Sequence, residues 1–244
     1  MTLLKVKGLH AGYGKLTILH QLNLSVESGQ FMAVLGPNGS GKSTLIKSIY
    51  GLTDIFSGTI QMQGQDLVSV PTEQISQSGL AYVPQRENIF STMTIRENLQ
   101  LALRHQSATQ KQSALDELFE LFPVLAERQR QRAEYLSGGE RQMVAIALAY
   151  LTQPQMMLLD EPSAGLAPRF VKSIFSKLRQ LCDMGITLLV VEQNARSLLQ
   201  WCDYAYILRE GRVAFHGSAA DTLSDEETVK GYLGVSTQTQ GIGV

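Results

Sequence analysis

Two segments near the start of the chain alternate between apolar and polar residues, which is the pattern of a strand with one buried face. They cover residues 3–9 and 16–26, and the glycine-rich residues 11–15 separate them. Ser28 and Gly29 follow the second segment as turn-forming residues. We therefore expect antiparallel strands joined by turns, forming a small β-subdomain.

Short, largely apolar runs later in the chain predict strands that are buried on both faces. These runs, with two shorter strand segments beside turns, cover residues 31–35, 57–62, 80–83, 156–159, 186–191, 204–208 and 212–215. Segments with helix-like apolar spacing lie between them at residues 45–50, 72–78, 94–104, 112–122, 143–151, 168–182 and 195–202. The alternation of strands and helices predicts an α/β fold.

Several helices follow one another without an intervening strand, so residues 86–150 are expected to form a helical insertion into the sheet domain. The first of these helices has a clear start, because Thr94 and Glu97 have the spacing of a capping box. We expect residues 1–235 to form one domain and residues 236–244 to form a flexible polar tail.

Composition and charge limit the functions that this chain of 244 residues can have. The formal net charge is −1, so the chain as a whole has no field that would attract nucleic acid. A charge run at residues 127–132 could touch RNA or phospholipid but is more typical of a solvated surface. The longest apolar run, residues 143–151, is half of what a membrane-spanning helix needs. Residues 1–6 lack the charged-then-apolar pattern of a signal peptide, so we expect none. Cys182 and Cys202 lack metal-ligand spacing and are expected to be buried. We therefore expect a soluble, cytoplasmic chain that reaches a membrane only through a partner.

The strongest chemical signal is a glycine-rich segment between a predicted buried strand and a predicted helix. It matches the pattern G-x-x-x-x-G-K-[ST] at every specified position, through Gly36, Pro37, Asn38, Gly39, Ser40, Gly41, Lys42, Ser43 and Thr44. In such a P-loop, backbone N–H groups and the helix dipole converge on a phosphate. Lys42 would contact the β- and γ-phosphates, and the Ser43 hydroxyl could bind Mg²⁺. The segment predicts binding of a nucleoside triphosphate.

A second signal is a pair of carboxylates at the end of an apolar strand. Asp160 closes the run at residues 156–159, and Glu161 follows it before Pro162. This Walker-B arrangement predicts that Asp160 holds the magnesium ion and that Glu161 polarises an attacking water.

Two further residues have both a structural and a functional interpretation. Tyr13 lies in a predicted turn, where its ring could stack on a base, but an ordinary half-buried tyrosine is the more common case. Ser137 precedes two glycines and a predicted helix, so it could cap that helix or, with the N–H groups of the helix start, bind a second anion.

Together, the P-loop, Gln85, the Walker-B strand and a third motif make the chain resemble an ABC-type ATPase subunit from about residue 3 to residue 233. The third motif is the family signature, formed by Leu136, Ser137, Gly138, Gly139 and Glu140. The resemblance implies a P-loop NTPase core with an antiparallel β-subdomain and an inserted helical subdomain. It also implies a head-to-tail dimer that holds two ATP molecules at its interface, with each signature acting on the ATP of the other subunit.

The resemblance also implies roles for individual residues. Tyr13 would stack on adenine, and Glu161 would be the general base. Ser43, Gln85 and Asp160 would organise Mg²⁺ and water.

Gln85 also begins the loop that senses the membrane domain in such subunits. Ile89, Phe90 and Met93 would then line a groove for a permease helix, or would instead belong to the core of the helical insertion.

Two positions depart from the wider family. Gln193 stands where many members have a histidine near the γ-phosphate, and Ala167 stands where an aspartate is usual. With the segments at residues 161–168 and 191–195, these features resemble the LivF-type subunit of branched-chain amino-acid importers. That resemblance implies two different ATPase subunits beneath two permease subunits at the cytoplasmic face of the inner membrane, supplied by a solute-binding protein. Branched-chain amino acids are the expected cargo, with urea or another amide-like solute as the alternative.

Two other functions fit the P-loop less well. An ABC ATPase acting on nucleic acid or ribosomes would typically have a coiled-coil insertion or two fused ATPase domains, and the chain has neither. A P-loop kinase would leave the signature at residues 136–140 unexplained. We therefore expect no nucleic-acid partner.

Overall fold

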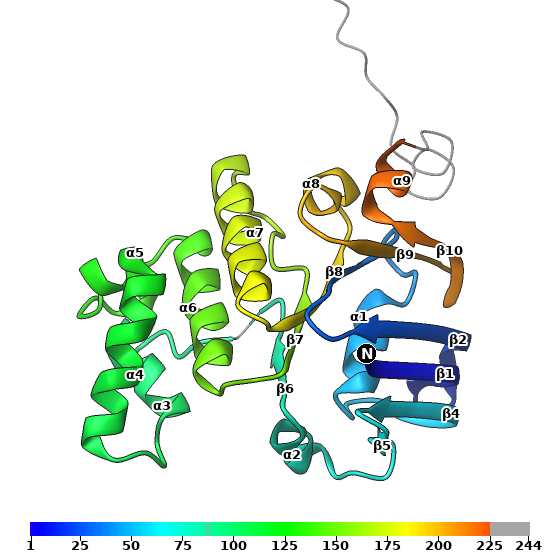
Figure 1. Ribbon diagram of the computed structural model, residues 1–244, viewed down its shortest axis with the longest axis horizontal. Helices are drawn as coiled ribbons and strands as arrows, with labels where there is room; N and C mark the ends of the chain where they lie inside the picture. The colour runs from blue at the N-terminus through cyan, green and yellow to red at the C-terminus, as the bar shows by residue number, and fades with distance from the viewer. Residues whose placement is uncertain (87, 225–244) are drawn as a thin grey trace, which may run out of the picture.

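The computed structural model describes residues 1–86 and 88–224. The tail expected at residues 236–244, and the end of the domain expected at residue 235, lie outside the described residues. Two sheets and the helices around them make up the described part of the chain (Figure 1).

The strands are β1 (Thr2–Tyr13), β2 (Leu16–Glu27), β3 (Phe31–Leu35), β4 (Asp54–Met62), β5 (Gln65–Asp66), β6 (Leu80–Val83), β7 (Met156–Asp160), β8 (Thr187–Glu192), β9 (Tyr204–Arg209) and β10 (Arg212–Ser218). The α-helices are α1 (Lys42–Ile49), α2 (Thr72–Ile75), α3 (Ile95–Ala102), α4 (Ala108–Leu121), α5 (Pro123–Glu127), α6 (Gly138–Leu151), α7 (Pro168–Asp183), α8 (Ala195–Leu199) and α9 (Ala219–Ser224). Short 3-10 turns at Ser76–Ser78 and Ala133–Tyr135 follow α2 and precede α6.

The larger sheet has the strand order β10-β9-β3-β8-β7-β6. Strands β6, β7, β8, β3 and β9 are parallel, and β10 adds an antiparallel edge. The expected α/β fold is therefore confirmed. Because the parallel strands share one direction, the segments that follow β3, β6, β7 and β8 leave the sheet at the same edge.

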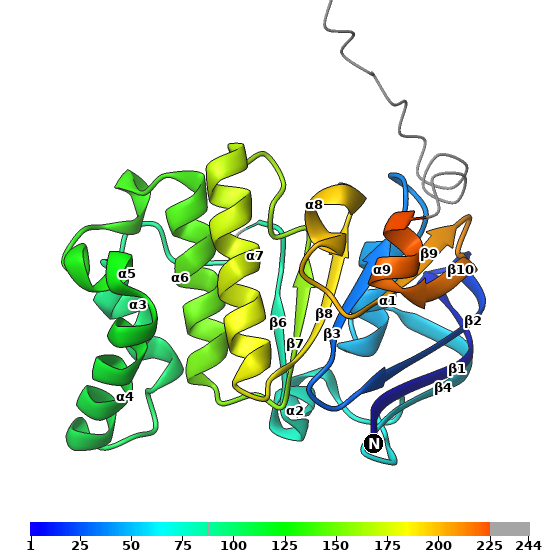
Figure 2. The same ribbon diagram turned by 45° about the horizontal axis from the view of Figure 1, so that its top comes forward.

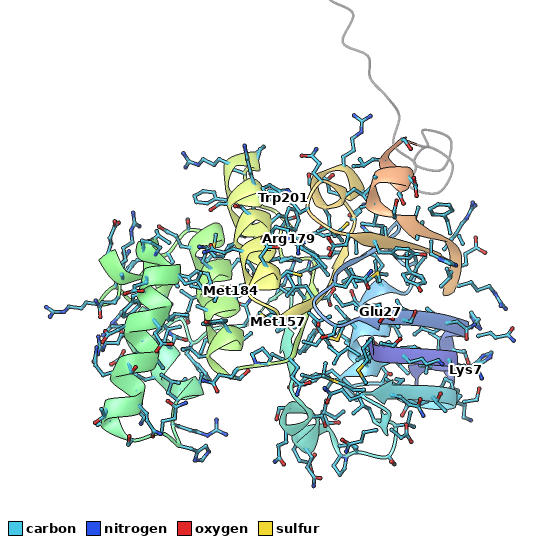
Figure 3. All side chains as sticks on the ribbon, in the orientation of Figure 1. Lys7, Glu27, Met157, Arg179, Met184 and Trp201 are labelled. Atoms are coloured by element: carbon cyan, nitrogen blue, oxygen red, sulfur yellow. The ribbon has the colours of Figure 1, made fainter. Side chains whose placement is uncertain are left out.

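Residues of the central strands alternate between two cores, which explains why these strands are apolar throughout. Phe31 and Ala33 of β3 pack in the cluster that contains α6 and α7, whereas Met32 and Val34 pack in the cluster that contains α1. Figure 2 shows α6 and α7 on one side of these strands and α1 on the other. Side chains fill both layers, with Met157 of β7 and Arg179 of α7 on the α7 side (Figure 3). The sheet thus separates α1, which starts in the P-loop, from α6, which starts in the signature motif.

The smaller sheet is antiparallel, with the order β2-β1-β4-β5, and its buried face packs on α1. The prediction of alternating strands is confirmed, but β1 is longer than expected and includes part of the segment predicted as a turn. Irregular pairing lets β1 continue to Tyr13. Glycine is needed at position 12 for this pairing, because a Cβ atom there would lie only 1.9 Å from the Leu16 carbonyl oxygen.

Helices α3, α4, α5 and α6 lie between β6 and β7 in the chain. The capping box of Thr94 and Glu97 is confirmed. The predicted start of α4 is wrong by four residues, because Ser107 and Gln110 form another capping box that starts the helix at Ala108.

The described residues contain no helix that is both long enough and apolar enough to cross a membrane. Cys182 and Cys202 are buried and unpaired, as expected. Burial raises the pKa of the Cys182 thiol to about 11 and that of Cys202 to about 12, so both behave as small apolar side chains.

Candidate functional site

The P-loop connects the end of β3 to α1, which begins at Lys42. The residue before the helix, Gly41, has a φ of 101°, a left-handed conformation that favours glycine. Gly36 has no room for a side chain, because a Cβ atom there would lie 2.4 Å from the Leu208 carbonyl oxygen. The motif therefore has glycine where the backbone must approach its neighbours closely.

Lys42 is buried at the mouth of this loop, with 4% of the residue exposed. Its Nζ atom donates hydrogen bonds to the carbonyl oxygens of Gly36 (2.9 Å) and Pro37 (3.1 Å) and lies 3.7 Å from Glu161 Oε1. Burial lowers the pKa of the ammonium group, whereas Glu161 and Asp160 oppose that shift. The loop thus holds a cation beside its backbone N–H groups, as a phosphate site requires.

Ser43 of the P-loop and Asp160 of the Walker-B strand lie side by side in the fold. The Ser43 hydroxyl donates a 2.8 Å hydrogen bond to Asp160 Oδ1, and the Tyr82 hydroxyl lies 3.4 Å from Asp160 Oδ2. Tyr82 is a contact that the sequence analysis missed, and its place on β6, the strand paired with β7, is the signal that could have found it. Burial, followed by the charge of Asp160, raises the pKa of the Tyr82 hydroxyl above its usual range. Tyr82 therefore stays a neutral donor.

Glu161 lies between Lys42 and Gln85. Its Oε2 atom accepts a 3.0 Å hydrogen bond from Gln85 Nε2, while Oε1 faces Lys42. Glu161 has a φ of 44°, which is uncommon for a residue with a side chain. Its N–H group donates to the Val191 carbonyl oxygen (3.0 Å), so pairing with β8 fixes this strained backbone. The carboxylate is therefore held at the edge of the sheet beside the P-loop lysine.

Glu192 is a second carboxylate at this edge that the sequence analysis did not single out. It is 2% exposed and accepts hydrogen bonds from the backbone N–H groups of Ser163 (2.9 Å) and Gln193 (3.3 Å). Burial raises the pKa of this carboxyl group, and the two hydrogen bonds oppose the shift. Glu192 thereby ties the segment after β7 to the end of β8.

Gln193, Ala167 and Tyr13 lie at the surface around this edge. The side chain of Gln193 is exposed directly after β8, and Ala167 precedes α7 without a side-chain cap. Tyr13 ends β1 with 43% of the residue exposed. No hydrogen bond or ion pair between described residues connects these three side chains to Lys42.

The signature motif starts helix α6, which begins at Gly138 and not at the expected residue 143. Ser137 is its N-cap, because the Ser137 hydroxyl oxygen accepts a 3.4 Å hydrogen bond from the Glu140 N–H group. In return, the Ser137 hydroxyl and N–H group both donate to Glu140 Oε2 at 2.8 Å. Burial favours a raised pKa for the Glu140 carboxyl group, but these hydrogen bonds and Arg128, 2.7 Å away, give a lowered pKa. Leu136 is buried before the cap.

The two glycines of the signature allow close packing at the start of α6. A Cβ atom at Gly139 would lie 2.7 Å from the ring of Phe170, and one at Gly138 would lie 3.0 Å from Leu166. The motif and the P-loop remain apart within one chain, because α6 and α1 lie on opposite sides of the larger sheet (Figure 2). The Ser137 end of α6 is exposed, so it is available to another molecule.

The residues beside Lys42 fit a nucleotide with Mg²⁺. The buried Ser40 hydroxyl has no partner within the described part of the chain, which is consistent with a loop shaped for a further ligand. The described residues contain no group of three His, Cys, Asp or Glu side chains that could hold a metal ion. Ser43 and Asp160 alone would leave most positions of a magnesium ion to water and phosphate, which is how Mg²⁺ usually binds with nucleotides.

Comparison with known proteins agrees with this geometry. The family model described as ABC transporter matches residues 19–164. The chain is 40% identical over 222 residues to the high-affinity branched-chain amino acid transport ATP-binding protein BraG of Pseudomonas aeruginosa, an alignment that covers 91% of this chain and 95% of that one. It is 39% identical to the probable branched-chain amino acid transport ATP-binding protein LivF of Archaeoglobus fulgidus, covering 96% and 99% of the two chains.

Similarity also extends beyond amino-acid transport. The lipopolysaccharide export system ATP-binding protein LptB of Escherichia coli K12 is 34% identical, covering 96% of this chain and 98% of that one. Among solved structures, the crystal structure of a nucleotide-free ATP-binding cassette from an ABC transporter superposes with a TM-score of 0.85 at 26% identity, covering 97% of this chain and all of that one. The chain therefore belongs to the ABC transporter family as an ATP-binding subunit, an ATPase coupled to transport.

Proposed function

We propose that this chain is the ATP-hydrolysing subunit of a membrane importer for branched-chain amino acids. The observation that supports this most is the convergence of Lys42, Ser43, Asp160 and Glu161 at one edge of the sheet, in a chain similar to BraG and LivF. The cargo is inferred from those relatives, because the transported molecule need not touch an ATPase subunit.

In this proposal the P-loop, Gly36 to Thr44, wraps the phosphates of ATP, and Tyr13 packs on the adenine ring. Lys42 supplies its buried ammonium group to the β- and γ-phosphates. Ser43 and Asp160 would hold Mg²⁺, and Gln85 would help to organise the metal and its water. Bound Mg²⁺ would neutralise charge on the phosphate oxygens.

Hydrolysis then depends on groups that already meet at this edge. Glu161 accepts a proton from the attacking water as the water oxygen bonds to the γ-phosphorus; the bond to the β–γ bridging oxygen breaks, and ADP leaves. Gln85 orients the Glu161 carboxylate through its 3.0 Å hydrogen bond. Gln193 donates a hydrogen bond toward the γ-phosphate but, unlike a histidine, cannot become cationic.

The second half of each site comes from another ATPase subunit. Ser137 to Glu140, with Leu136 buried behind them, would meet the ATP held by the partner, because α6 points this segment outward on the far side of the sheet from α1. Gln193 and Ala167 resemble the LivF-type subunit, which pairs with a different ATPase subunit, so they favour the same kind of pairing here.

Contact with permease subunits would come from the segment after β6. Phe90 is 59% exposed, and the buried Asn98 exchanges hydrogen bonds with its backbone N–H and carbonyl groups, at 2.7 and 2.9 Å. Ile89 packs on the core instead. Phe90 therefore fits the contact with a permease helix, and Ile89 fits the core of the helical insertion. The chain would then lie at the cytoplasmic face of the inner membrane, with the helical insertion at residues 86–150 toward the permease and a solute-binding protein as an indirect partner.

The test of this proposal is recovery of the chain from detergent-solubilised membranes with an affinity tag. We expect two permease subunits and a second ABC ATPase in the purified complex. A Phe90→Asp variant should lose the permease, whereas Phe56→Asp, an equally large exposed phenylalanine on β4, should keep it. Recovery of a permease-free species, or of a complex with export components, would contradict the proposal.

A further inference from the structure

A cavity of about 630 Å³ lies between the smaller sheet and the β9–β10 hairpin, outside the P-loop site. Its basic lining residues come from β1, β2 and β10, and they are Lys5, Lys7, His20, Arg212 and His216. The other lining residues are uncharged. Figure 3 shows Lys7 at the outer end of the small sheet, away from the layers that contain α6 and α7. The cavity is large enough for a small organic ligand.

These basic groups lack acidic partners in the described part of the chain. No Asp or Glu oxygen of the described residues lies within 4.0 Å of a side-chain nitrogen of Lys5, Lys7 or Arg212. The whole chain has a net charge of −1, so this concentration of positive charge is local. A concave surface lined by one sign of charge attracts ligands of the opposite sign.

The backbone around the cavity is irregular in a way that positions its side chains. The pairing of β1 with β2 shifts between Leu9 and Ala11, and Gln21 at the shift has a φ of 53°. Such a bulge redirects the neighbouring side chain, which here is His20. A strained residue persists only where its surroundings hold it, so the bulge is a fixed part of the cavity wall.

The opposite wall is held by aromatic contacts. The Tyr204 hydroxyl and His216 Nδ1 are 2.7 Å apart, and the His216 ring stacks on Tyr206 with centroids 5.1 Å apart. The Tyr206 hydroxyl accepts a 3.3 Å hydrogen bond from the Ser25 N–H group of β2. Both walls are therefore fixed before any ligand arrives, which lowers the cost of binding.

The cavity is also joined to the P-loop by two backbone hydrogen bonds. The Gly211 carbonyl oxygen accepts from the His20 N–H group (2.9 Å), and the Gly211 N–H group donates to the Ser40 carbonyl oxygen (3.0 Å). Gly211 lies beside the lining residue Arg212. The cavity wall is thus continuous with a rigid part of the protein.

We propose that this cavity is a second anion site, which binds a multiply charged phosphorylated molecule separately from the ATP of the P-loop. The cationic groups of Lys5 and Lys7 on β1 and of Arg212 on β10 line one volume that is larger than a single phosphate needs, and Lys and Arg are the side chains that bind phosphate oxygens. The phosphate groups could belong to a soluble molecule or to a lipid headgroup.

The experiment compares two double variants of the full chain saturated with the non-hydrolysable nucleotide AMP-PNP and Mg²⁺. Lys7→Gln with Arg212→Gln removes two charges from the cavity. Lys111→Gln with Arg130→Gln removes two charges from the α4–α6 region as a matched control. Isothermal titration calorimetry with inorganic tripolyphosphate measures the soluble source. Sedimentation with vesicles that contain cardiolipin, a lipid with two phosphate groups, measures the lipid source. Thermal unfolding checks that each variant is folded.

We expect the unmodified chain and the control to bind one of these probes with equal affinity, and the cavity variant to bind it about tenfold more weakly or worse. The probe that shows this difference identifies the source of the phosphate. Equal binding by the two variants, or binding of neither probe by the unmodified chain, would overturn the proposal.

Discussion

Lys42 is the charged residue of the P-loop, and its ammonium group donates hydrogen bonds to two backbone carbonyl oxygens of that loop. Replacing Lys42 by methionine removes this charge. Methionine has a similar length and no charge, so the substitution tests the ammonium group more than the space it fills. In the free protein, the variant loses two hydrogen bonds and the 3.7 Å ion pair with Glu161, but it also loses the cost of a buried cation, whose lowered pKa shows that burial opposes its charge. We therefore expect the free energy of unfolding to change by no more than about 1–2 kcal/mol.

Nucleotide affinity should change much more. Only 3% of the Lys42 side chain is exposed, so its contact with phosphate would be made away from water. Removing one partner of a buried charge pair typically costs about 2–5 kcal/mol, which corresponds to roughly 30-fold to several thousand-fold weaker binding of MgATP.

Isothermal titration calorimetry with MgATP measures this effect, and Lys47→Met is the matched control. Lys47 lies on the same helix, five residues later, and belongs to none of the ion pairs of the described residues. The control should bind MgATP within a factor of about two of the unmodified chain, because an exposed or half-buried charge contributes little. Unchanged affinity in Lys42→Met, or an equal loss in both variants, would refute the phosphate role of Lys42.

Three further predictions concern the carboxylates and the signature. Glu161→Gln should bind MgATP normally but release phosphate about 10²–10⁴-fold more slowly, and ordinary turnover would remove Glu161 as the base. Ser137→Ala should lower the free energy of unfolding by about 0.5–2 kcal/mol through loss of the N-cap of α6. It should also reduce ATP hydrolysis by the paired subunits, and normal hydrolysis would mean that Ser137 serves only as the helix cap. Glu192 has a raised pKa in the fold, so its stabilising contribution is complete below its ordinary value of 4.5 and declines as pH rises through the folded value. The free energy of unfolding of Glu192→Gln, measured with urea, should therefore fall less between about pH 4 and pH 7 than that of the unmodified chain. An identical pH profile of the two proteins would contradict this.

Local patterns predicted much of the fold because they depend on neighbours in the chain. The P-loop glycines, the cap at Thr94 and the carboxylates at the end of β7 each follow from residues a few positions apart. The meeting of Ser43 with Asp160 was also predictable, because Ser43 follows β3, Asp160 ends β7, and both strands end at the same edge of the sheet.

Features that depend on packing were not predictable in the same way. The start of α6 was placed too late because glycine is a poor helix former, yet Gly139 is required there by the ring of Phe170. The contact of Tyr82 with Asp160 and the burial of Glu192 both depend on the strand order β8-β7-β6, which no local pattern contains. The cavity at the β9–β10 hairpin likewise joins strands from opposite ends of the chain.

Uptake of radiolabelled leucine into proteoliposomes that contain the purified complex tests the central claim most directly. ATP enclosed in the vesicles, with the solute-binding protein outside, should drive leucine uptake by unmodified complexes whose ATPase subunits face the lumen. The same complex carrying Glu161→Gln should bind ATP and transport no leucine, and labelled urea should not be taken up by either. Leucine transport that persists in the Glu161→Gln complex, or ATP-driven transport of urea in place of leucine, would contradict the account.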